Sequence, residues 1–222
     1  HSLGRRQRQM CIRDSSRVFA ARTCMMAGVG LTGVFLWYLV RFWVYGKAVV
    51  LTSAPLTIPA GFLIAGMAVA TLIGAALASW AAGPFSERIE EKNIPVARVV
   101  AGACLLYAAG LALAWGLGVW STGTARENGM LLFALISGFA FGVYDSLGLE
   151  LVMDSLPDPR RAGHDLGIYA LANSAGLALA AIIGALLVNA FEHSFGYYLL
   201  FPSAIVMVLL AGIVTLTTKS AE

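Results

Sequence analysis

Charged side chains are scarce in this 222-residue sequence. Lys, Arg, Asp and Glu together make up 12% of it, whereas apolar residues make up 59%. A typical soluble domain carries about 25% charged residues, and the mean hydropathy here is +0.80. So little charge excludes an ordinary water-soluble fold and indicates an integral membrane protein.

Cysteine is also rare, and the common catalytic motifs are missing. Cys11, Cys24 and Cys104 lack metal-ligand spacing, so we expect no metal and no cofactor. The sequence has no G-x-S-x-G elbow and no H-E-x-x-H pair. An intramembrane enzyme, such as a rhomboid-like protease or a lipid-modifying transferase, would need a serine facing a histidine. Ser174 has no histidine partner in any apolar run, so we expect no enzyme and keep this class as an alternative.

Six long runs without charge are present instead. A helix needs about 20 apolar residues to cross the bilayer core. The second run is longer than one span, but Pro55 and Pro59 interrupt it, so we expect its helix from near Ile58 to near Gly83 and Pro84. Six runs predict six transmembrane helices. The runs are 23–40, 48–86, 99–125, 128–144, 166–191 and 194–218.

The positive charges lie mostly on one side of these expected helices. The other side holds Arg126, with Arg41 and Lys47 near the outer end of the first helix. Because basic loops stay in the cytoplasm, both termini should be cytoplasmic in a multi-pass protein of the plasma (inner) membrane. The charges form no stripe on a soluble face, which excludes nucleic acid as a partner. The crowded side holds Arg17, Arg22, Arg88, Lys92, Arg98, Arg160, Arg161 and Lys219.

Residues 1–16 differ from the rest of the chain. They are basic and polar and lack the apolar core of a signal peptide. The string R-Q-M-C-I-R-D-S at 8–15 resembles a translated sequencing adapter. We therefore expect 1–16 to be a non-native or disordered leader and 17–222 to be one six-helix transmembrane domain. The alternative is a genuine cytoplasmic tail.

Two expected loops resemble motifs of the major facilitator superfamily. The segment G-P-F-S-E-R at 83–88, followed by Lys92, resembles the loop between the second and third helices of each half. The segments F-G-V-Y at 141–144, D-S-L-P-D-P at 154–159 and 165–173 resemble the fourth-to-fifth helix region of the C-terminal half in the sugar-transporter-like branch. The chain departs from these patterns at Glu87 and Glu90, and at Gly148, where related transporters tend to carry an acid.

The resemblance implies an all-α integral membrane fold. Its six helices would form half of a twelve-helix transporter, as two inverted three-helix repeats. It implies the C-terminal half of a secondary active transporter that moves a small solute by alternating access. The suggested solute is a sugar, and the suggested driving force is coupling to protons. The expected partners are the lipid bilayer, a small-molecule substrate and the missing N-terminal half, with a homodimer and a non-transporting scaffold as alternatives.

Asp145 is the main candidate for the substrate or proton path. An acid at the centre of a membrane helix costs about 2.5–3.5 kcal/mol, so it faces a cavity or a partner. Asp145 shares a face with Gly138 and Gly142. It could bind substrate or a coupling proton, or it could be a structural acid paired with a neighbouring helix. The other candidates for the path are Tyr144, Tyr38, Arg41 and Asn173; Arg41 could instead reach outward to the membrane interface.

A cytoplasmic gate is expected at the end of the fourth helix. Glu150 and Asp154 are four residues apart there and could pair with Arg88 or Arg160, in a contact that breaks when the transporter opens inward. A solvated helix end is the alternative. The gate and its loop motifs comprise Gly83, Glu87, Arg88, Glu150, Asp154, Arg160 and Arg161.

Small residues at four-residue spacing form ridges on the second and fifth expected helices. They include Gly66 and Gly74 on the second helix and Gly176 and Gly184 on the fifth. Such ridges allow close approach between helices. In the resembled fold these helices form the seam between the two halves, whereas the alternative is packing within this bundle.

The charge distribution makes the topology testable. Single cysteines at Asn93 and Gly163 should react with an impermeant thiol reagent only from the cytoplasmic side, and a cysteine at Gly123 only from outside, because the basic loops hold the first two positions inside. Labelling of intact cells against inverted vesicles measures this. The reverse pattern would contradict the predicted orientation.

Overall fold

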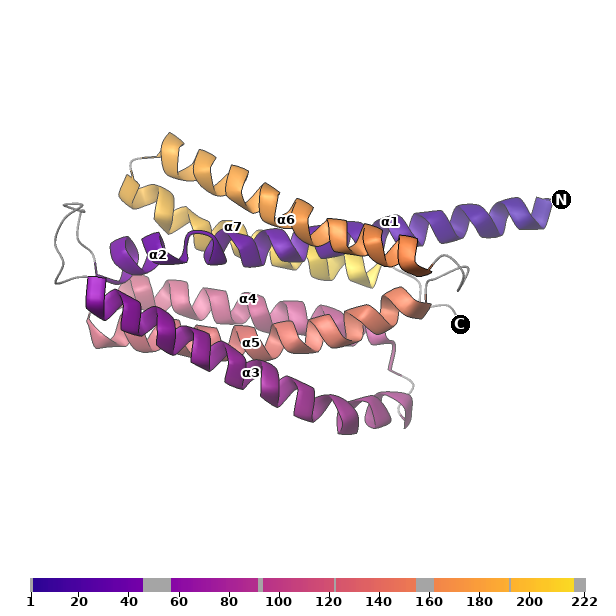
Figure 1. The fold of residues 1–222 in the computed structure, drawn as a ribbon, viewed down its shortest axis with the longest axis horizontal. Helices are drawn as coiled ribbons and strands as arrows, with labels where there is room; N and C mark the ends of the chain where they lie inside the picture. The colour runs from indigo at the N-terminus through magenta and orange to yellow at the C-terminus, as the bar shows by residue number, and fades with distance from the viewer. Residues whose placement is uncertain are drawn as a thin grey trace.

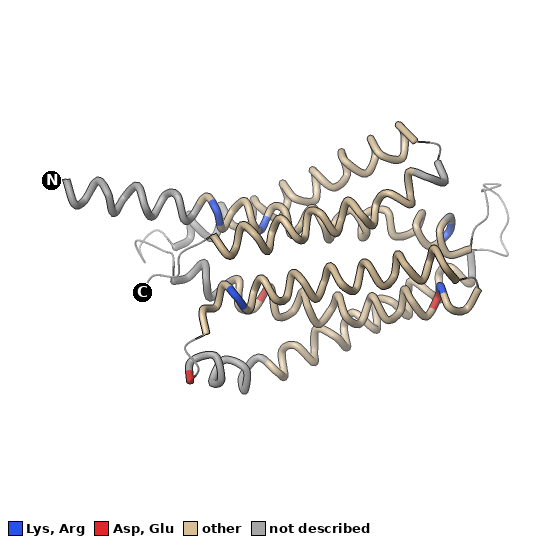
Figure 2. The backbone as a smooth tube through the Cα atoms, turned by 180° about the vertical axis from the view of Figure 1, so that it is seen from behind, with Lys and Arg blue, Asp and Glu red and all other residues tan. Residues whose placement is uncertain are grey.

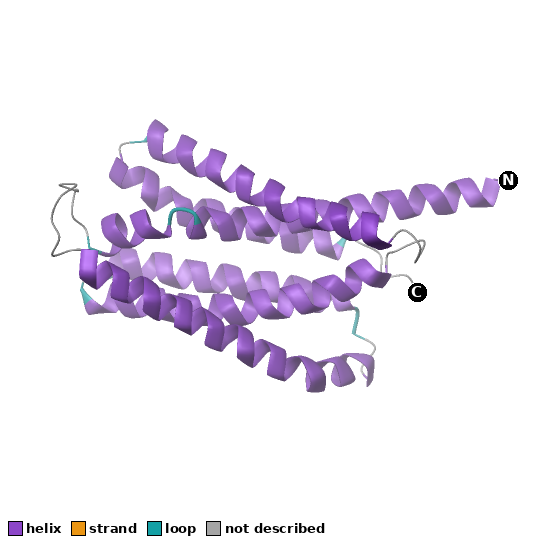
Figure 3. Ribbon diagram, in the orientation of Figure 1, coloured by secondary structure: helices purple, strands orange, loops and turns teal. Residues whose placement is uncertain are grey.

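The computed structural model describes the backbone of residues 2–45, 57–91, 94–121, 123–154, 162–191 and 193–217. Within these ranges, the side chains of 2–15, 42, 57–58, 82–90, 149–154, 162–166, 168 and 193–195 are not described. All regular structure in the described ranges is helical (Figure 3). The all-α expectation is confirmed for this part of the chain.

The helices run roughly alongside one another in one bundle (Figure 1). We call the end at which α1 enters and α7 finishes the terminal end, and the opposite end the distal end. Charged residues gather toward these two ends, and the middle of the bundle carries none among the described residues (Figure 2). The helices are α1 (Ser2–Gly33), α2 (Leu36–Tyr38), the π-helix η1 (Leu39–Val44), α3 (Thr57–Glu91), α4 (Val96–Trp120), α5 (Thr124–Asp154), α6 (Ala162–Ala190) and α7 (His193–Leu216).

Five helices are long and apolar enough to span a membrane, which supports a multi-pass membrane protein. The first expected run differs, because α1 ends at Gly33 and a turn precedes α2. The stretch of α1 directly before residue 23, where this run begins, also carries two charged residues, Arg17 and Arg22. Of the six expected transmembrane helices, the described residues therefore show five. The five candidate spans are Pro59–Ala81, Val96–Trp120, Thr124–Gly148, Tyr169–Ala190 and Gly196–Leu216.

For the second expected helix, the predicted start is correct and the predicted end is wrong. Its start near Ile58 is confirmed, since α3 begins at Thr57, and Pro59 falls in the first turn, where its missing N–H is not needed. Its expected end at Gly83 and Pro84 is wrong, because α3 continues to Glu91. A proline removes one helical hydrogen bond, and here the helix continues past it. The apolar span nevertheless ends at Ala81.

The helices pack in two linked groups. Both α3 and α4 pack on α5, both α6 and α7 pack on α1, and α4 joins the groups through α7. The core between them contains fully buried side chains such as Met25, Leu31, Leu111, Met130 and Phe201. Each group is thus built around one helix, α5 in the first and α1 in the second, and α4 and α7 connect the two groups.

Glycines allow two close helix crossings. At the crossing of α3 and α5, a Cβ added at Gly138 would collide with the Thr71 backbone, and one at Gly74 would collide with the Leu135 carbonyl oxygen. At the crossing of α1 and α6, a Cβ at Gly176 would lie 2.7 Å from the Thr23 carbonyl oxygen. Backbone contacts of this kind exclude any side chain larger than hydrogen.

The ridge glycines mostly pack inside this bundle. Gly74 and Gly176 lie at the two crossings, and Gly184 lies against the Phe35 ring. Gly66 faces the Leu131 side chain, which a Cβ would approach to 3.2 Å. The described contacts of these glycines are therefore contacts within the bundle, as in the alternative reading, and their part in a seam with another half stays a prediction.

Alanine at Gly138 should destabilise the protein, whereas alanine at Gly61 should not. The added methyl at position 138 meets backbone atoms of α3, which cannot rotate away, and overpacking of this kind costs about 1–3 kcal/mol. A Cβ at Gly61 meets no atom within 4 Å, so its higher helix propensity should leave stability equal or raised. Thermal unfolding in detergent, followed by circular dichroism, compares the two. Equal unfolding midpoints for the two variants would contradict the close crossing of α3 and α5.

Candidate functional site

A single buried guanidinium connects three helices. The side chain of Arg22, on α1, is 5% exposed, and its Nη2 lies 2.7 Å from Oδ1 of Asp145 on α5. Its Nε donates a hydrogen bond of 2.7 Å to Oδ1 of Asn173 on α6. Arg22 therefore joins α1 to α5 and α6 through an ion pair and a charged hydrogen bond.

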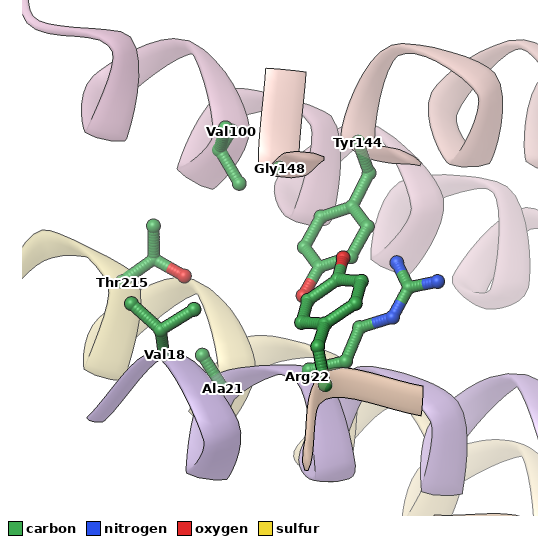
Figure 4. A pocket seen from close by; sticks show the side chains of 8 residues that line it. Val18, Ala21, Arg22, Val100, Tyr144, Gly148 and Thr215 are labelled. Carbon is green, nitrogen blue, oxygen red and sulfur yellow. The ribbon is translucent and has the colours of Figure 1, made fainter. Parts of the chain in front are cut away.

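Aromatic rings surround the same guanidinium. The Arg22 Cζ lies 4.9 Å from the ring centroid of Tyr169, 5.5 Å from that of Tyr144 and 5.8 Å from that of Phe141. Figure 4 shows Tyr144 reaching from one helix toward Arg22 on another. Cation–π contacts of this kind stabilise a cation that has left water. The rings thus lower the cost of burying Arg22.

A small cavity lies beside Arg22. Its volume is about 10 Å³, room for about one water molecule. Arg22 Nη1 is buried and has no hydrogen-bond partner among the described residues. The cavity in this closed arrangement is far too small for a sugar. It is lined by Val18, Ala21, Arg22, Val100, Tyr144, Gly148, Tyr169 and Thr215 (Figure 4).

The acid and the amide that contact Arg22 lie within candidate membrane spans. Asp145 belongs to the span Thr124–Gly148, and Asn173 to the span Tyr169–Ala190. At the terminal end Arg17 donates a hydrogen bond to the Thr217 carbonyl oxygen, and Arg22 lies five residues further along α1, or roughly 8 Å deeper. The Asp145 side chain is 53% exposed. The acid therefore stands on the outer face of the bundle, below its terminal rim.

Three of the predicted path residues come together here. Arg22 forms an ion pair with Asp145, a cation–π contact with Tyr144 and a hydrogen bond with Asn173. The first two of these partners belong to α5 and the third to α6. The contact made by Asp145 is the one expected of an acid paired with a neighbouring helix. The glycines on its face do not line a cavity, because Gly138 and Gly142 approach α3.

Tyr38 and Arg41 lie elsewhere. Tyr38, on α2, is 48% exposed and stacks on Tyr197 with 6.2 Å between ring centroids. Arg41 belongs to η1 and is partly buried. Both positions lie along the chain beyond Gly33, toward the distal end, so the structure does not join them to the Arg22 cluster.

The predicted gate falls largely outside the described side chains. Gly83, Glu87 and Arg88 belong to the last turns of α3, and Glu150 and Asp154 to the last turns of α5, where only the backbone is described. Arg160 and Arg161 lie outside the described residues altogether. The pairing of these acids with basic residues stays a prediction.

The sequence alone does not identify Arg22, Phe141 or Tyr169 as parts of this site. Arg22 directly precedes the run 23–40, so it reads as one more cytoplasmic charge. One signal could have narrowed the search: an acid at the depth of Asp145 requires a partner, and Arg22, Arg98 and Lys219 are the basic residues that directly adjoin an apolar run at the same end.

The distal end is closed by a second set of contacts. Arg126 donates hydrogen bonds to the carbonyl oxygens of Ser121, at 2.7 Å, and Trp43, at 3.0 Å. The Trp43 ring packs edge-on against Tyr198, with centroids 4.6 Å apart, and also against Phe201. These contacts attach η1 to α5 and α7, and they attach the end of α4 to α5.

No protein-family model, curated protein or solved structure matches this chain.

A double-mutant cycle measures the coupling between Arg22 and Asp145. Asp145→Asn should destabilise the protein by roughly 1–3 kcal/mol, because it leaves a buried guanidinium without its counter-charge. Replacing both residues, as Arg22→Met with Asp145→Asn, should recover part of that loss, because an apolar pair needs no counter-charge. Thermal unfolding of the four proteins gives the coupling energy. Costs that simply add would mean that the two residues act independently.

Proposed function

We propose that this chain is the C-terminal half of a secondary active transporter of the major facilitator type. It moves a small solute across the membrane by alternating access, and the face formed by α1 and α5 lines the solute path. One observation carries this proposal: the acid of a charged pair, Asp145, belongs to a candidate membrane span, and its side chain is 53% exposed on the outside of the bundle.

Lipid is a poor environment for that carboxylate. Acids within membrane spans face water or a protein partner, because hydrocarbon solvates them poorly. Lysine and arginine can extend to the interface from such a depth, but aspartate is too short to do so. The exposed side of Asp145 therefore needs an aqueous path or a second protein surface against the α1–α5 face. A second transporter half across a water-filled path supplies both.

The packing supports an organisation in two repeats. The helices correspond in order: α1 to α5, α3 to α6, and α4 to α7. The contact of α3 with α5 then corresponds to that of α6 with α1, and the contact of α4 with α5 to that of α7 with α1. Consecutive spans alternate in direction, so α1 and α5 run in opposite directions and the repeats are inverted. In this proposal α1, α2 and η1 together make the sixth span, with an interruption of the kind that transporters place near their substrate paths.

The finer features rest on the charges and on the resemblance of the two loops. The basic residues favour a cytoplasmic position for the terminal end and both termini, in the plasma membrane. The loop motifs favour a sugar as the solute. Asp145 serves either as a ligand for that solute or as the carrier of a coupling proton, and Arg22 holds it in place when neither is bound.

Transport by the full-length protein tests these roles. The reading frame extended upstream should add six further helices, and the resulting protein should take up at least one member of a panel of radiolabelled hexoses and pentoses in a host strain without its own sugar transporters. If Asp145 carries the proton, Asp145→Asn should abolish concentrative uptake and retain exchange, because exchange moves no net proton. If Asp145 binds the sugar, both should fall together.

Ser146→Ala is the matched control. Ser146 is the exposed neighbour of Asp145, and its hydroxyl bonds only to carbonyl oxygens of its own helix, so uptake should be unchanged. Normal concentrative uptake by Asp145→Asn at normal expression would leave Asp145 as a structural acid. A full-length protein that moves none of the sugars would favour a scaffold or another solute class.

A further inference from the structure

A second, larger cavity lies between α3, α4 and α5. Its volume is about 400 Å³, and its lining includes Ala78 of α3, Gly102 and Leu106 of α4, and Val143 and Ser146 of α5. None of these residues belongs to the Arg22 cluster. An apolar cavity of about 150 Å³ already accepts benzene, so this one has room for a longer hydrocarbon.

The cavity exists because two helices diverge. Both α3 and α4 pack on α5, but among the described residues they make no extensive contact with each other, whereas α6 and α7, in the corresponding position, do touch. Figure 1 shows α3 leaving the other helices toward the terminal end. The cavity is therefore a groove that opens sideways between α3 and α4, at the level of the membrane.

The lining of the groove is suited to hydrocarbon alone. Of the described residues that line it, only Ser146 has a polar side chain. The Ser146 hydroxyl donates a 2.9 Å hydrogen bond to the Gly142 carbonyl oxygen, so its proton is already used. A sugar or a column of water would lose hydrogen bonds on entering, because the walls offer none in return.

One basic residue, Arg98, lies on α4 beside residues that line the groove. Gly102 and Leu106 line it four residues apart on α4, and Ile94 lines it just before α4 begins. Arg98, four residues before Gly102, lies on the same stripe of α4. Arg98 is exposed and belongs to the first turns of the span that begins at Val96. A long side chain at this level reaches the headgroup region, and the positive end of the α4 dipole adds to its charge.

We propose that this groove binds one acyl chain of an anionic phospholipid, with Arg98 on the lipid phosphate. The occupant is a lipid because the groove opens within the membrane spans, where acyl chains are the surrounding solvent. It is anionic because the stripe that holds the chain ends in a positive charge. This lipid site goes beyond the proposed transport function and does not depend on it.

Photo-crosslinking of the full chain in lipid nanodiscs tests the site. The probe is phosphatidylglycerol with a diazirine on its acyl chain, in a phosphatidylcholine background, and labelled peptides are mapped by mass spectrometry. Label should concentrate on 94–106 and 139–147. Gly102→Phe should remove most of it, because the ring fills the groove, and a Cβ at Gly102 meets no atom within 4 Å, so the backbone need not move.

Two controls make the outcome decisive. Gly61→Phe places the same ring in equally open space on α3, away from the groove, and should leave the label unchanged. Arg98→Gln should lower labelling by phosphatidylglycerol about fivefold, the effect of roughly 1 kcal/mol for one basic residue near an anionic headgroup. The same variant should not change labelling by a phosphatidylcholine probe.

Three results would overturn the proposal. Label spread evenly over the lipid-facing helices and unaffected by Gly102→Phe would show that the groove holds no particular lipid. Absence of label from both segments would show that protein covers the groove. Equal labelling by the two headgroups, indifferent to Arg98→Gln, would refute the anionic phospholipid.

Discussion

Two close helix crossings, α3 on α5 and α1 on α6, attach the outer helices of the two groups, and the contact between α4 and α7 joins the groups. In a membrane, apolar side chains gain little by leaving lipid for one another, so association depends on close packing and on polar contacts. Gly74 and Gly138 bring backbones together at the first crossing, and Gly176 does so at the second. Between α1 and α5, by contrast, the described link is a polar one, the Arg22–Asp145 pair.

The Arg22 cluster follows from the cost of charge in an apolar setting. The guanidinium leaves water completely, and it recovers solvation from one carboxylate, one amide oxygen and the faces of aromatic rings. No single helix supplies all of these partners. The cluster therefore stabilises the joint arrangement of α1, α5 and α6 and makes the terminal half of the bundle sensitive to any change at Asp145.

Much of the fold could be predicted from the sequence because lipid imposes a simple rule. Apolar runs must be helical to satisfy their backbone, so five spans and the start of α3 at Thr57 follow from hydropathy and proline position. The break after Gly33 and the continuation of α3 past Pro84 do not. Both depend on packing against neighbouring helices, and a one-dimensional pattern contains no information about neighbours.

The candidate site could be predicted only in part, for the same reason. Asp145 stands out because an acid is expensive at its depth, and Tyr144 and Asn173 follow from the resemblance of their segments. Arg22 lies at the border of an apolar run, where a basic residue is ordinary, and only the three-dimensional arrangement shows that it faces inward. The groove beside Gly102 is still harder to predict, since it arises from a space between helices and not from any residue pattern.

The unequal exposure of the two charges decides which of them can move. Arg22 is 5% exposed and Asp145 53% exposed. If Arg22 left the pair, it would need to carry a full charge past packed rings and across its own buried surroundings. Asp145 can leave by rotating toward the open face, where a solute, a proton or water replaces the guanidinium. In the proposed transport cycle, Asp145 is therefore the charge that moves, and Arg22 stays in place.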